Sequence, residues 1–222
     1  QRTKVSNLDL RYELYPRAGE MFTVGAYFKH FDKPIEYFFN RTGPATVTFD
    51  VINTKMATAF GGEIEYRKKL GFIKALKNFT VTGNLSYIYS KVEDTTGAVN
   101  RPLQGQSPYL VNVGLQYDLE KIGLSSTLLF NQIGRRILFV GNAEIPNVWE
   151  APRPLLDLQI AKKILKKKGE IKLNISDIFN QQANFYHDLD NNKKYAAHSK
   201  DVLSISRNYG TNFTIAFSYS IK

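Results

Sequence analysis

The sequence predicts an all-β protein, namely a transmembrane antiparallel up-and-down β-barrel. Large apolar residues alternate with small or polar ones through segments of roughly nine to fourteen residues, which suits tilted membrane strands. The pattern is clearest in residues 213–222, where Phe, Ile and Tyr alternate with Thr, Ala and Ser. The connections between these segments are alternately short and long, as they are at the two ends of an outer-membrane barrel.

The first three expected strands cover residues 5–15, 21–33 and 57–70. In the first of them, Leu and Tyr alternate with charged and amide side chains, and residues 16–19, with their Pro and Gly, then predict a tight turn. We expect a long irregular connection over residues 34–54, within which residues 47–51 can extend a strand beyond the membrane.

The next three expected strands cover residues 78–91, 107–119 and 124–138. The first two are among the clearest, because Phe, Val, Leu and Tyr oppose Thr, Asn and Gln. A turn over residues 69–77 leads into this group, a polar loop over residues 93–106 divides it, and a short turn over residues 120–123 follows.

The last three expected strands cover residues 155–165, 170–178 and 213–222. A loop over residues 141–154, which holds the only Trp of the chain, precedes them. A lysine-rich turn over residues 166–169 joins the first two, and a polar stretch over residues 180–212 leads to the last. The expected count is about nine strands.

The composition of the two strand faces favours lipid outside the barrel. Alternation alone does not decide, because soluble barrels such as lipocalins alternate with the apolar face inward. The polar faces of residues 78–138, however, carry hydroxyls and amides more than Lys and Glu. Tyr109 and Tyr117 lie about 26 Å apart along a strand, or about 20 Å in height when tilted, near the spacing of aromatic girdles. Glu170 and Lys172 argue the other way, since they suit a soluble sheet.

Charge and composition exclude several classes of protein. The net charge of +10 could suggest nucleic acid, but the basic residues cluster at expected turns, as in residues 67–69 and 166–168, so we expect no nucleic-acid partner. No run of eighteen apolar residues predicts a transmembrane helix. The absence of Cys excludes a disulfide scaffold and thiol chemistry.

The parity of the strands suggests a longer protein. The last strand follows a long connection, so it ends on the short-turn side, which is the periplasm in an outer-membrane barrel. An odd strand count then places Gln1 outside the cell, whereas bacterial single-chain barrels have an even count. We therefore expect residues 1–222 to be the C-terminal part of a barrel domain whose first strands lie upstream. A miscounted strand is the alternative.

Several segments resemble TonB-dependent outer-membrane receptors, particularly those of Bacteroidota. They are residues 6–16, 22–36, 101–118, 130–137, 152–158 and 173–180, and the strongest is Arg101-Pro-Leu-Gln-Gly-Gln-Ser-Pro-Tyr-Leu-Val-Asn-Val-Gly-Leu-Gln-Tyr-Asp118. The resemblance implies a 22-stranded barrel that an upstream plug domain fills. It implies import of a nutrient such as a siderophore, glycan or peptide. The implied partners are outer-membrane lipids, the plug, a TonB-type periplasmic energy transducer and a surface lipoprotein. The chain departs from the usual aromatic ending, because Lys222 follows Ile221.

Four residues are candidate ligand contacts in the lumen or the extracellular loops. Arg135 is expected on the lumen side beside Asn131, where it can guide an anionic ligand or pair with a neighbouring strand. Trp149 and Tyr186 fall in long connections, where aromatic rings can stack on a ligand or pack between loops. His187, with the aspartate that follows it, can contact a substrate or form a solvated pair.

The sequence predicts no cofactor, no metal site and no catalytic residue. His30, His187 and His198 lack the spacing of metal ligands, and neither a Ser-His-Asp order nor G-x-S-x-G occurs. We expect active import across the outer membrane rather than an enzyme. The alternatives are a scaffold or pore subunit of a multiprotein outer-membrane complex, and an outer-membrane enzyme such as a lipase.

Overall fold

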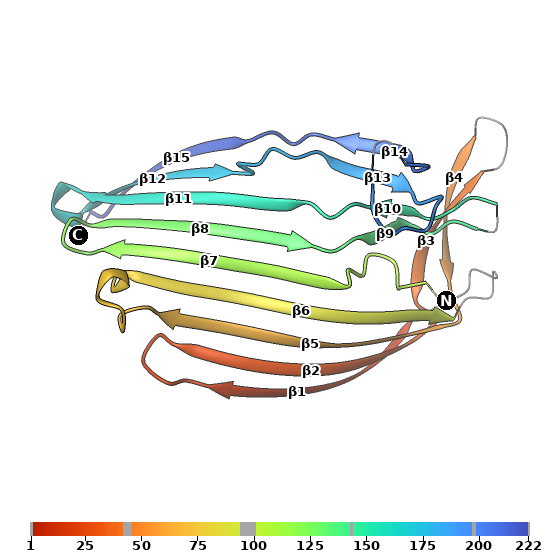
Figure 1. Cartoon of the computed structure of the whole chain (residues 1–222), viewed down its shortest axis with the longest axis horizontal. Coiled ribbons are helices and arrows are strands. Elements are labelled where there is room, and N and C mark those ends of the chain that lie inside the picture. The colour runs from red at the N-terminus through yellow and green to blue at the C-terminus, as the bar shows by residue number, and fades with distance from the viewer. Residues whose placement is uncertain (1, 42–45, 94–100, 143, 197–198, 222) are drawn as a thin grey trace.

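The computed structural model describes the chain except for residues 1, 42–45, 94–100, 143, 197–198 and 222 (Figure 1). Among the described residues, nine strands form one sheet in the order β1-β2-β5-β6-β7-β8-β11-β12-β15. Each strand pairs with its neighbours in antiparallel fashion, which confirms the predicted up-and-down sheet. The strands are β1 (Lys4–Leu14), β2 (Met21–Asp32), β5 (Met56–Lys69), β6 (Phe79–Glu93), β7 (Tyr109–Leu119), β8 (Leu124–Ile133), β11 (Pro154–Ile164), β12 (Gly169–Ser176) and β15 (Asn212–Tyr219).

The long connections contain further strands that the sequence pattern largely missed. β3 (Ile35–Arg41) and β4 (Val47–Asn53) form a hairpin, so residues 47–51 do form a strand, but in a separate two-stranded sheet rather than as an extension of a strand of the nine-stranded sheet. In the part of the chain that is described, a four-stranded sheet has the order β14-β13-β10-β9. Its strands are β9 (Arg136–Phe139), β10 (Val148–Glu150), β13 (Ala183–His187) and β14 (Val202–Arg207). The connections over residues 141–154 and 180–212 are therefore more regular than expected.

The expected strand over residues 124–138 is divided in two. β8 ends at Ile133, and the chain leaves the ladder at Gly134 before β9 begins at Arg136. A Cβ on Gly134 would lie 2.8 Å from the Tyr109 ring, so only glycine fits this approach. After the break, β9 belongs to the four-stranded sheet rather than to the nine-stranded one.

The turns are short at one end of the sheet and long at the other, as predicted (Figure 1). Gly19 and Gly123 adopt positive φ angles of 80° and 64° in two of the short turns. Other short turns contain the 3-10 helices η1 (Lys74–Leu76) and η2 (Leu165–Lys167). None of the helices found among the described residues has the length and apolar character that crossing a membrane requires.

Strand register brings the apolar side chains onto one continuous face. Leu115 lies opposite Leu128, and Leu128 lies opposite Leu158. On the other face, Asn112 lies opposite both Asn84 and Asn131. A shift of one residue in any ladder would break this agreement, so the register is set by the pattern itself.

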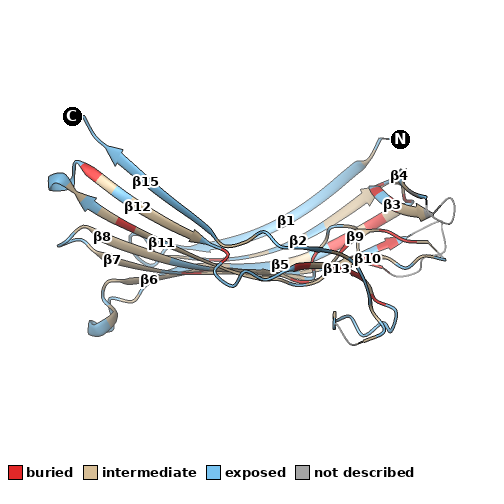
Figure 2. Cartoon of the chain, turned by 90° about the horizontal axis from the view of Figure 1, so that it is seen from above, coloured by how far each residue is buried: buried red, intermediate tan, exposed pale blue. Residues whose placement is uncertain are grey.

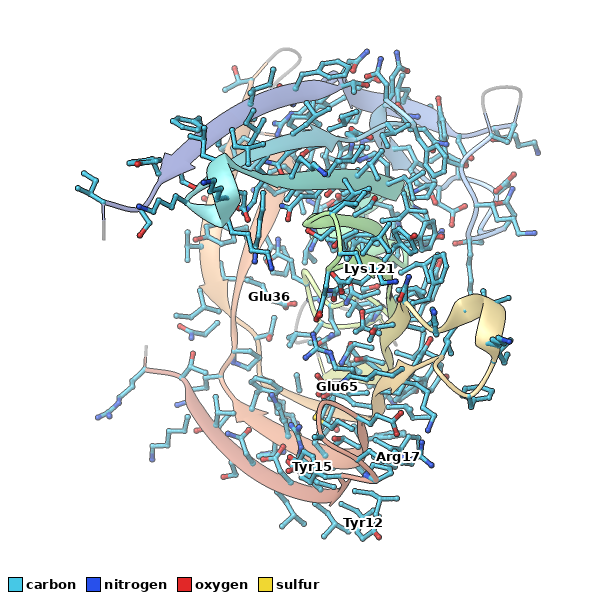
Figure 3. The ribbon with its side chains drawn as sticks, turned by 90° about the vertical axis from the view of Figure 1, so that its left-hand side faces the viewer. Tyr12, Tyr15, Arg17, Glu36, Glu65 and Lys121 are labelled. Atoms are coloured by element: carbon cyan, nitrogen blue, oxygen red, sulfur yellow. The ribbon has the colours of Figure 1, made fainter. Side chains whose placement is uncertain are left out.

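The apolar face is the convex one. The nine-stranded sheet is curved into an open trough (Figure 2), and seen from its end it forms an arc (Figure 3). In that view Tyr12 projects outward from the arc, whereas Tyr15 and Glu65 lie inside it (Figure 3). Large apolar side chains such as Leu10 and Ile215 remain 77% and 76% exposed. Such a surface suits hydrocarbon, while the concave face suits a wet interior.

Candidate ligand-binding site

Three of the four candidate contact residues meet in the four-stranded sheet. Trp149 on β10 and Tyr186 on β13 are directly opposite in the register. Arg135, from the break between β8 and β9, places its guanidinium 3.6 Å from the centre of the Trp149 ring. The same guanidinium donates a hydrogen bond of 3.2 Å to the Tyr186 hydroxyl. The cation therefore stacks on one aromatic ring and is oriented by the other.

Asp188 completes this cluster and was not among the predicted residues. Its carboxylate forms an ion pair with Arg135, and the two side chains are only 2% and 13% exposed. Burial alone would raise the pKa of Asp188, but the hydrogen bond and charge of Arg135 outweigh it and hold the pKa below its usual range. Burial raises the pKa of Tyr186, which therefore stays a neutral phenol.

The cluster also holds the connection that follows β13. The backbone N–H of Lys193 donates to the Asp188 carboxylate at 3.1 Å, and the Tyr195 ring lies 5.2 Å from the Tyr186 ring. Arg135 therefore helps to hold residues 188–195 in place, because it binds Asp188. This agrees with the sequence alternative in which the arginine pairs with a neighbouring strand.

His187 lies apart from this cluster. It is adjacent to Tyr186 on β13, so its side chain points to the opposite face of the sheet. Its Nδ1 atom lies 3.0 Å from the Pro146 carbonyl oxygen, and its ring is 6.3 Å from that of Phe39. Phe39 in turn packs against Phe49 and Phe139, so His187 borders an aromatic cluster rather than the arginine stack.

A cavity of about 580 Å³ adjoins the stack. It is lined mainly by aromatic, proline and basic residues. They are Tyr87, Ile88, Tyr89, Ser90, Lys91, Pro102, Gln106, Pro108, Tyr109, Arg135, Trp149, Pro152, Lys193 and Lys194. The sequence predicted Arg135 and Trp149 as candidate contacts but could not predict that they lie beside β6. That proximity depends on how the long connections fold.

A second hollow of about 780 Å³ includes much of the concave face. Amides and carboxylates from neighbouring strands contribute to it, including Glu65, Asn84, Asn112, Asn131 and Asp157. These groups can accept and donate hydrogen bonds to water, to a polar ligand or to a protein segment in the interior. The alternation in the sequence predicted this polar lining without singling out individual residues.

Three carboxylates of the connection after β13 could meet at a cation. Asp188, Asp190 and Asp201 place ligand oxygens within 4.8 Å of one another. Oxygen ligands of this kind suit hard cations such as Ca²⁺. The charge of Asp188 is already matched by Arg135, so the group also has an explanation as part of the folded connection.

The β3–β4 hairpin is fastened by a buried ion pair that the sequence analysis missed. Glu36 accepts hydrogen bonds of 2.8 Å and 2.7 Å from the Arg101 guanidinium, and one of 3.0 Å from the Gln104 backbone. Figure 3 shows Glu36 inside the arc, with the hairpin standing across its open side. A lone carboxylate in the apolar segment Ile35–Arg41 was the available signal, because a buried charge requires a partner.

Comparison with known proteins identifies the family. The model of the outer membrane protein beta-barrel family matches residues 3–219. No curated protein matches the chain.

Solved structures with the same fold include several transporters. The copper transporter OprC aligns with a TM-score of 0.67 and 16% identity over 98% of this chain and 31% of its own. The FrpB iron transporter from Neisseria meningitidis aligns with a TM-score of 0.62 and 12% identity, over 98% of this chain and 30% of its own. The ferric yersiniabactin uptake receptor FyuA from Yersinia pestis aligns with a TM-score of 0.61 and 15% identity, over 97% of this chain and 29% of its own. At these identities the likeness establishes the barrel fold, and the chain spans about 30% of the length of these structures. With its apolar convex face and its match over residues 3–219, the chain belongs to the outer membrane protein beta-barrel family and resides in the outer membrane.

Proposed function

We propose that the chain is the C-terminal part of the barrel of a TonB-dependent transporter, which imports a nutrient across the outer membrane. The observation that carries the proposal is the nine-stranded antiparallel sheet with an apolar convex face and a polar concave face. Its edges are β1 and β15. Backbone groups at such edges have no partner in hydrocarbon, so further strands would close the barrel, and 22 strands would leave a lumen for a plug.

The proposal assigns a role to each part of the molecule. The polar concave face packs against an upstream plug domain, and a TonB-type periplasmic protein supplies energy through that plug. The long connections lie outside the cell and capture the nutrient, so the C-terminus is periplasmic. The proteins of similar fold are a copper transporter, an iron transporter and a ferric yersiniabactin uptake receptor. A metal complex, siderophore, glycan or peptide is the corresponding ligand class here, and a surface lipoprotein is a further partner.

Uptake by cells that carry the complete gene tests the transport proposal. Radiolabelled copper, ferric siderophores and oligosaccharides are supplied to wild-type cells and to a deletion strain. We expect one of these classes to accumulate only in wild-type cells, and a protonophore or removal of the TonB-type transducer to abolish the accumulation. Uptake that survives both treatments would indicate a passive pore. Absence of uptake together with co-purified subunits would instead support a scaffold in a multiprotein complex.

Labelling of single cysteines tests the orientation. The chain has no Cys, so a cysteine can be introduced at Asn191 in the β13–β14 connection or at Lys121 in the β7–β8 turn. Lys121 lies at the short-turn end, which faces the viewer in Figure 3. A membrane-impermeant maleimide should label Asn191→Cys on intact cells and should label Lys121→Cys only after the cells are broken. The reverse pattern would place the C-terminus outside the cell.

A further inference from the structure

The cavity of about 580 Å³ beside Arg135 is lined in part by residues of the apolar face of the sheet. Two of its lining residues, Tyr87 and Tyr109, lie opposite each other in the β6–β7 ladder. Tyr89, a third, lies opposite Phe60, and their rings are 5.1 Å apart. These residues belong to the same convex face as Leu115 and Leu128, so this part of the cavity faces the hydrocarbon rather than the lumen.

The cavity lies at the height where hydrocarbon gives way to water. At the short-turn end, Phe79 and Tyr117 lie opposite each other with their rings 4.9 Å apart. Tyr87 and Tyr109 form the second aromatic row, about 26 Å away along the strands and about 20 Å away in height. Aromatic rows of this kind mark the two interfaces of a membrane barrel, and lipid headgroups occupy that level.

Basic side chains border the aromatic wall at this level. Lys91 comes from β6, and Lys193 and Lys194 come from the connection after β13. Within the part of the chain that the structure describes, neither Lys193 nor Lys194 forms an ion pair, whereas the charge of Arg135 is matched by Asp188. The two free ammonium groups therefore give this side of the cavity a positive charge.

The backbone of these two lysines is held in place. The N–H of Lys193 donates to Asp188 at 3.1 Å, and the N–H of Lys194 donates to the Asn192 side chain at 2.7 Å. Asp188 is itself held by Arg135, which stacks on Trp149. The arginine stack thus positions the cations beside the tyrosines, and less conformational freedom is lost when a ligand binds.

We propose that this cavity binds a phosphate-bearing anionic membrane lipid. Lys193 and Lys194 donate to the phosphate oxygens, and Lys91 reaches the headgroup from the strand side. An acyl chain lies along Tyr87, Tyr89 and Tyr109 and continues over the apolar convex face. A lipid fits better than a soluble anion, because a soluble anion would leave the aromatic wall exposed. The site rests on the membrane placement of the sheet and is independent of what the transporter imports.

Native mass spectrometry of the complete protein in detergent tests this site. The probes are dioleoyl phosphatidylglycerol, bis-phosphorylated lipid A, dioleoyl phosphatidylethanolamine and inorganic phosphate. We expect at least one of the two anionic lipids to bind about tenfold more tightly than phosphatidylethanolamine, because the headgroup ammonium of that zwitterionic lipid offsets its phosphate charge and is repelled by the two lysines. The double variant Lys193→Gln/Lys194→Gln should lose this preference while keeping the heat-modifiable gel mobility of a folded barrel.

A matched pair of lysines at the other end of the sheet provides the control. Lys166→Gln/Lys167→Gln removes the same charge from the β11–β12 turn and should leave the tenfold preference unchanged. Equal binding of anionic lipids and phosphatidylethanolamine by the wild-type protein would overturn the proposal. So would an equal loss in both double variants. Displacement of the lipid by inorganic phosphate would assign the cavity to a soluble anion instead.

Discussion

Many large apolar side chains are exposed on the nine-stranded sheet, whereas several of those in the long connections are buried together. Leu10 on β1 and Ile215 on β15 are 77% and 76% exposed, but Ile137 on β9 and the adjoining Val140 are both 0% exposed. The first region needs hydrocarbon around it to make its surface favourable. The second builds a small core of its own, as a protein in water does.

The ion pairs of the two regions differ in the same way. Arg11 and Glu13 on β1 pair with side chains that are 53% and 39% exposed. Arg101 and Glu36, which join a long connection to β3, pair with side chains that are 5% and 1% exposed. An exposed pair contributes little to stability, whereas a buried charge cannot lose its partner without a large cost. Packing and buried charges therefore order the long connections, whereas alternation and register order the nine-stranded sheet.

Replacement of Glu36 by Gln should produce the largest effect, because it removes the buried carboxylate that pairs with Arg101 and accepts two hydrogen bonds from its guanidinium. We expect a local cost of about 3–5 kcal/mol in the β3–β4 hairpin. Hydrogen exchange should report it at the Phe39 and Val140 amides, which form hydrogen bonds of 2.8 Å and 3.0 Å between β3 and the end of β9. Exchange there should accelerate by roughly 10² to 10⁴-fold.

Glu13→Gln is the matched control in the nine-stranded sheet. It removes the carboxylate of the exposed Arg11–Glu13 pair, so amide exchange in β1 should not change measurably. If both variants accelerate exchange to the same extent, the distinction between a buried and an exposed pair fails. If neither does, the hairpin is held by its backbone contacts with β9 alone.

A charge on the convex face tests the other half of the comparison. Leu128 on β8 lies between Leu115 and Leu158 on the apolar face. Leu128→Arg should destabilise the folded barrel by about 2–4 kcal/mol if it lies near the bilayer midplane. Urea unfolding of the complete protein in lipid vesicles measures this cost. Thr127→Arg places the same charge one residue away on the polar face, where we expect it to be tolerated; equal costs would mean that the faces are assigned the wrong way round.

The contrast between the regions also explains how far the sequence could predict the structure. The ends of seven of the nine expected strands lie within two residues of the observed ones, because alternation and turn residues act locally; among the described residues the exceptions are the β8 and β15 ends. The break after β8 was missed, although the alternation stops at Asn131 and Gly134 follows shortly after it. The meeting of Arg135 with Asp188 depends on contacts about fifty residues apart in sequence, and no local period encodes such a contact. The ligand-contact role of Arg135, Trp149, Tyr186 and His187 stays a prediction.

The smallest effect is expected from titrating Asp188. The pKa of Asp188 in the folded protein lies below its ordinary value. The ion pair with Arg135 therefore stabilises the folded protein at pH values above the ordinary pKa, and this stabilisation is lost as the pH falls through the folded pKa. The connection after β13 should therefore loosen only below about pH 4. Exchange of the Lys193 amide, corrected for the intrinsic pH dependence, should accelerate between pH 5 and pH 3 in the wild-type protein, because that amide donates to Asp188. In Asp188→Asn the corrected rate should be faster at pH 5 and independent of pH. A pH-dependent rate in that variant would assign the titration to another group and would remove Asp188 as the link between the arginine stack and the lysines.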